Sequence, residues 1–149
     1  MSPFDVRSAL MAKHAQHVVI VHFPIALPLM SWLFNLLARW RCSLALAAAA
    51  YYNLAWAAIS SLAAVATGLA AWQRQLGGAR LKGNLRLDLV LAVVCSVMLW
   101  VLWRIRAQHR LPARAPGKLY FTLAALTTAA IALTGHLGGF LSGVNSAGG

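Results

Sequence analysis

Histidine is the residue type in this 149-residue chain best suited to hold a metal or a cofactor, and there are five of them. His22 lies just inside a long apolar segment, and His136 lies about five residues before the end of another. An imidazole loses its hydration inside a bilayer and tends to be retained there where it finds a metal, a carbonyl or a carboxylate. These two histidines are therefore the first candidates for chemistry.

The elements that must position them are long and apolar. Hydrophobic residues make up 61% of the chain and charged residues 10%, whereas a soluble domain carries about 25% charged residues. The apolar runs cover about 18–38, 44–72, 87–103 and 119–141. Each meets or approaches the ~20 residues that cross a ~30 Å hydrocarbon core. We therefore expect one all-α domain over residues 1–149, an integral membrane four-helix bundle with both termini on one side.

The basic residues flank these apolar runs. The net charge is +11, and the thirteen lysines and arginines precede the first run or fall in the connections between runs. Such clusters typically contact anionic lipid headgroups, and no separate basic face remains that could bind the phosphate backbone of a nucleic acid. The expected partner is the lipid bilayer and not nucleic acid.

Because the number of spans is even, the start of the first and the end of the fourth lie on the same side of the membrane, which brings His22 and His136 to matching depth. Both lie about 7 Å from the end of their helix, at 1.5 Å per residue, on the same side of the membrane. Haem b accepts an axial ligand on each face of its iron, so two imidazoles at equal depth on neighbouring helices suit it. We expect His22 and His136 to be the iron ligands.

The surroundings of His136 and the second connection are compatible with this prediction. Gly135 and Gly139 remove side-chain bulk, so that a flat macrocycle could lie against the helix, and Arg80 and Arg86 could pair with haem propionates. In the alternative, the two histidines hydrogen-bond to each other or to carbonyls, and the glycines only permit close helix packing.

His17 is a weaker candidate as a metal ligand. It precedes His22 by five residues, about 140° around a helix, so the two do not share a face. Placement at the lipid interface is the simpler expectation.

Hydrolytic chemistry is not expected. The chain has two acidic residues, Asp5 and Asp88, and no carboxylate pair or nucleophile–base pattern. An electron-transfer subunit is favoured over a stand-alone enzyme. The alternative is a cofactor-free structural or anchoring subunit of a membrane complex, and the oligomeric state stays open.

Three motifs resemble those of a bacterial family of small four-span membrane proteins of unknown function. They are His17-Val18-Val19-Ile20-Val21-His22-Phe23-Pro24-Ile25-Ala26-Leu27, Thr67-Gly68, and Thr134-Gly135-His136-Leu137-Gly138-Gly139. The resemblance covers roughly residues 14–143. The sequence departs from the family pattern at Val18, where proline is usual, at Ala71, where an acidic residue is expected, and at His136 itself.

That family is distantly similar to membrane cytochromes b. The resemblance implies b-haem, a membrane quinone as a possible cofactor, and electron transfer to a redox partner within a larger membrane complex. It also implies a multi-pass protein of the bacterial inner (cytoplasmic) membrane.

Overall fold

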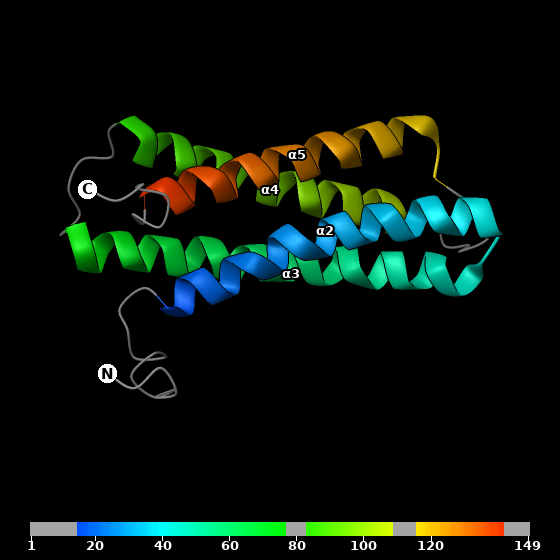
Figure 1. Cartoon of the computed structure of the whole chain (residues 1–149), viewed down its shortest axis with the longest axis horizontal. Helices are drawn as coiled ribbons and strands as arrows, with labels where there is room; N and C mark the ends of the chain where they lie inside the picture. Colours follow the sequence, from blue (N-terminus) through cyan, green and yellow to red (C-terminus); the bar gives the residue numbers. More distant parts are fainter. Residues whose placement is uncertain (1–14, 77–82, 109–115, 142–149) are drawn as a thin grey trace.

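The computed structural model describes residues 15–76, 83–108 and 116–141, and these residues form four helices. They are α2 (Ala15–Arg41), α3 (Leu44–Leu76), α4 (Gly83–Gln108) and α5 (Lys118–Leu141). The helices lie side by side in one bundle, and α2 begins at the end of the bundle where α5 finishes (Figure 1). The predicted all-α four-helix architecture is confirmed.

A tight turn joins α2 to α3. Cys42 has a φ of 48°, in the left-handed region that ends many helices. Ser43 then caps α3, because its Oγ accepts a hydrogen bond from the Leu46 amide at 3.3 Å. The turn makes α2 and α3 antiparallel neighbours.

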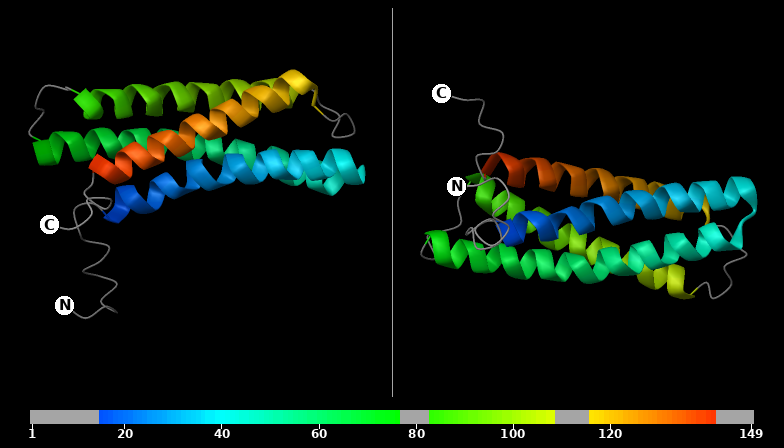
Figure 2. Two further views of the ribbon diagram at one scale, coloured as in Figure 1. Left: turned by 45° about the horizontal axis from the view of Figure 1, so that its top comes forward. Right: turned by 60° about the horizontal axis from the view of Figure 1, so that its bottom comes forward.

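The helices pack in a ring. Each contacts its neighbours in the sequence, and α5 closes the ring by packing on α2 (Figure 2). The antiparallel α2 and α5 are therefore adjacent, although almost eighty residues separate them in the sequence.

Small residues on α3 let α2 approach closely. Ala47, Ala50 and Ala57 are buried and are spaced by three and seven residues, about one and two helical turns. Across this contact, the buried Ser31 hydroxyl donates to the Ala50 carbonyl at 2.8 Å. The α2–α3 contact is the most extensive in the bundle.

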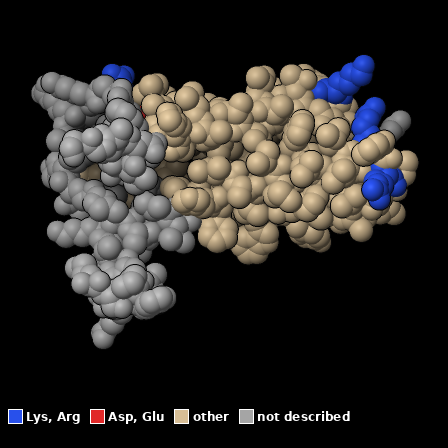
Figure 3. Space-filling view, viewed as in Figure 1, with Lys and Arg blue, Asp and Glu red and all other residues tan. Residues whose placement is uncertain are grey.

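The outer surface of the bundle is apolar over its middle. Exposed large hydrophobic side chains occur on all four helices, among them Phe23, Leu33, Trp56, Val97 and Leu126. Charged side chains lie near the two ends of the visible face (Figure 3). Four helical segments are long and apolar enough to cross a bilayer: Ile20–Arg41, Leu44–Ala70, Arg86–Gln108 and Lys118–Leu137. The chain is a multi-pass membrane protein.

The third apolar helix is longer than the sequence pattern indicates. The apolar run fades at Trp103, but α4 continues to Gln108. Arg104 and Arg106 therefore lie on the helix. The sequence pattern had predicted that they lie in a connection.

Candidate functional site

A direct contact fixes the register between the helices that carry His22 and His136. A Cβ added at Gly135 of α5 would lie 2.9 Å from Cδ1 of Ile25 on α2. Because the two helices are antiparallel, His22 then lies level with position 138, only two residues from His136. The two histidines differ in depth by ~3 Å at 1.5 Å per residue.

Both imidazoles project from the outer face of the α2–α5 pair. At about 100° per residue, Ile25 lies ~100° and His22 ~160° around α2 from the buried Pro24. Counted in the same way around α5, in the direction of increasing residue number, Gly135 lies ~40° and His136 ~140° from the buried Ile131. Both histidines are thus on the outer side of the Ile25–Gly135 contact, and both side chains are exposed.

Gly135 has a packing role. The Ile25 side chain occupies the space beside its Cα, so α2 and α5 touch at the depth of the histidines. This contact matches the close-packing alternative for Gly135, and it leaves no gap between α2 and α5 for a macrocycle at this level. The role of Gly135 in cofactor binding stays a prediction.

The other predicted site residues are only partly described. Arg86 is exposed near the start of α4, at the same end of the bundle as the two histidines. His17 lies in the first turns of α2 and Gly139 in the last turn of α5, but the surroundings of both side chains lie outside the described residues. Arg80 also lies outside them.

The bundle interior near this depth is polar. The Ser61 and Ser96 hydroxyls join α3 to α4 at 2.6 Å, and Cys95 Sγ lies 3.8 Å from the hydroxyl of Thr134 on α5. Cys95 is buried, as expected for a cysteine that packs as a small apolar residue. The Cys95–Thr134 contact ties α5 to α4 two residues before His136.

A second polar cluster lies toward the other end of the bundle. Arg106 of α4 and Asn35 of α2 are 5% and 2% exposed, and Tyr120 of α5 is also buried. The Asn35 amide donates to the Ser31 carbonyl on its own helix at 3.0 Å, and its Oδ1 has no hydrogen-bond partner among the described residues. Buried polar side chains of three helices therefore lie toward this end of the bundle.

These buried polar residues were not predicted from the sequence, although a signal was available. Arg106 follows Leu99 and Leu102 at the three- and four-residue spacing of a buried helical face. Because Arg106 lies beyond the end of the apolar run, the sequence did not show that the buried face continues to it.

In the described part of the chain, no three residues among His, Cys, Asp and Glu gather into a metal-binding group. A site made by the histidine pair alone would therefore have two protein ligands. That number corresponds to the two axial positions of a haem iron.

Residues 13–147 match a family model whose description is "Predicted membrane protein (DUF2231)". No curated protein and no solved structure matches the chain.

Proposed function

The chain belongs to the DUF2231 family of predicted membrane proteins, and we propose a redox role for it within the membrane. It is a b-type haem-binding subunit of the bacterial cytoplasmic membrane that transfers electrons between a membrane quinone and a redox partner in a larger complex. The observation that carries the proposal is the placement of His22 and His136 within ~3 Å of the same depth and on one face of adjacent helices.

The residues present suit a haem held on the outer face of α2 and α5. His22 and His136 would supply the axial nitrogens, and the exposed Arg86 is a candidate to pair with a propionate. When bound, haem supplies a centre that gains and loses one electron. The Ile25–Gly135 contact holds the two ligand-bearing helices in fixed register, which keeps the imidazoles at one depth.

The outward direction of the histidines favours a larger assembly. A polar iron site facing hydrocarbon is costly, and covering it with another protein removes that cost. The proposed subunit therefore presents its cofactor toward a partner.

A visible absorption spectrum of the purified chain, oxidised and reduced, tests the haem directly. We expect a Soret band in the wild type and its loss in His22→Ala and His136→Ala, since each variant removes one axial ligand. His109→Ala, which changes a histidine outside the proposed site, serves as the matched control. Equal haem content in His22→Ala and His109→Ala would refute the proposal.

An anchoring role without a cofactor is the second candidate. Only 22% of the residues in each membrane-spanning window are buried inside the bundle, so most of each helix surface is available to lipid or to another subunit. A haem-free chain that copurifies with a membrane enzyme complex would support this alternative.

A further inference from the structure

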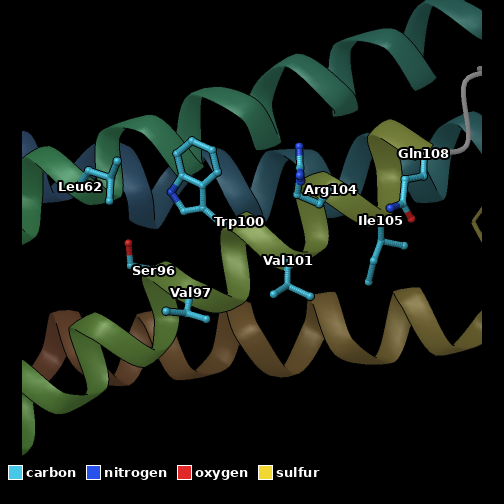
Figure 4. A pocket seen from close by; sticks show the side chains of 8 residues that line it. All are labelled: Leu62, Ser96, Val97, Trp100, Val101, Arg104, Ile105 and Gln108. Atoms are coloured by element: carbon cyan, nitrogen blue, oxygen red, sulfur yellow. The ribbon is translucent and has the colours of Figure 1, made fainter.

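An open groove runs along the outer face of α4, beside α3. Its volume is about 470 Å³, and its walls are mainly apolar, with Leu62 on α3 and Val97, Val101 and Ile105 on α4 (Figure 4). Trp100 and Arg104 line it from the same side of α4, one helical turn apart. The groove lies away from the outer face of α2 and α5 that carries the histidines.

The length of the groove corresponds to one leaflet of a bilayer. From Val97 to Gln108 it follows twelve residues of α4, which are eleven steps of 1.5 Å or ~17 Å. Half of a ~30 Å hydrocarbon core is ~15 Å. A single lipid acyl chain therefore matches the groove in length.

One end of the groove is polar and basic. Arg104 and Gln108 are exposed there, and the exposed Arg39, Arg41 and Lys118 lie at the same end of the bundle. Within the described residues the only acidic side chain is Asp88, about 24 Å away along α4 from Arg104. The charge at this end favours an anionic headgroup.

The Trp100 ring forms part of the apolar wall of the groove. Its indole nitrogen is buried and has no hydrogen-bond partner in the described part of the chain, so it is out of reach of an acceptor in the groove. Trp100 therefore contributes apolar surface one turn deeper than Arg104, where an acyl chain would lie below its headgroup.

We propose that this groove binds one anionic phospholipid from the leaflet at the basic end of the bundle. Its acyl chain lies along Val97, Val101 and the Trp100 ring, and its phosphate pairs with Arg104. The proposal is independent of the haem at the histidines.

Native mass spectrometry tests the site. The full chain in detergent is mixed with phosphatidylglycerol or phosphatidylcholine, and the lipid that stays bound after release from the detergent is measured. We expect the wild type to retain phosphatidylglycerol preferentially and Arg104→Gln to lower its retention about fivefold, the change expected for one basic residue near an anionic surface. Arg39→Gln removes an exposed charge at the same end but on α2, so it should retain the lipid. Equal losses in the two variants, or no preference for phosphatidylglycerol in the wild type, would overturn the proposal.

A second variant tests the groove without changing charge. Val101→Trp fills the groove from an exposed position on α4 and should reduce the retention of both lipids. Circular dichroism confirms that each variant is folded before lipid is measured. Unchanged retention in a folded Val101→Trp protein would show that the lipid binds elsewhere.

Discussion

At the scale of single residues, Arg106 is the most unusual side chain among those that the structure describes. It is 95% buried in a membrane-spanning helix, and its Nε has no hydrogen-bond partner among the described residues. One feature offsets part of this cost: Arg106 lies in the last turn of α4, where the helix dipole favours a cation. The dipole does not replace a carboxylate.

Replacing Arg106 therefore tests whether its charge stabilises the fold. Methionine has a similar length and no charge, and replacing buried ionic groups by apolar ones of similar volume is often neutral or stabilising. We expect Arg106→Met to unfold in detergent at the same temperature as the wild type or a higher one. A loss of about 3 kcal/mol or more, the usual effect of breaking a buried ion pair, would instead reveal a counter-charge paired with Arg106.

The Ser61–Ser96 hydroxyl pair gives a second prediction at this scale. Each serine lies on a different helix, and the oxygens are 2.6 Å apart in the buried interior. Hydrogen bonds between membrane helices average about 0.6 kcal/mol in double-mutant cycles. The cycle Ser61→Ala, Ser96→Ala and both together should give a coupling of this size in unfolding experiments. A coupling of zero would mean that the bond contributes nothing beyond packing.

At the scale of elements, the α2–α3 hairpin depends on one strained residue. Cys42 adopts a positive φ, which costs a residue with a side chain ~1 kcal/mol or more but does not strain glycine. The hairpin forms because the Ser43 cap and the alanine face of α3 stabilise it.

Glycine at position 42 should therefore stabilise the hairpin. We expect Cys42→Gly to raise the free energy of unfolding by up to about 1 kcal/mol, and Cys42→Val to lower it, because a β-branched residue is disfavoured at positive φ. Thermal unfolding of the three proteins in one detergent measures both effects. A stabilising Cys42→Val would contradict the observed turn geometry.

At the scale of the whole molecule, the contact between Ile25 and Gly135 closes the ring. It joins the first described helix to the last and sets the register on which the proposed histidine pair depends. The neighbouring atom is the end of a flexible side chain, so a single added methyl at position 135 can be accommodated by a small shift of Ile25.

Larger side chains at position 135 should separate α2 from α5. We expect Gly135→Ala to have a small effect and Gly135→Leu to destabilise the bundle by about 1–3 kcal/mol through overpacking. Ile25→Ala in the Gly135→Leu background should recover part of the loss, because it makes room at the same point. Additive effects of these two substitutions would show that the residues do not touch.

The sequence by itself determined the architecture of this protein. Four apolar runs separated by basic connections predict four membrane-spanning helices, because a backbone in hydrocarbon must satisfy its hydrogen bonds within each helix. Parity alone put the start of the first helix and the end of the fourth at the same end, and with them His22 and His136.

Only the tertiary structure decided which face each residue occupies. In a bilayer both faces of a helix are apolar, so hydropathy does not separate the bundle interior from the lipid surface. The outward direction of His22 and His136, the burial of Arg106 and the packing of Gly135 on Ile25 all depend on how the helices are rotated and paired. That rotation is set by contacts between residues far apart in the chain.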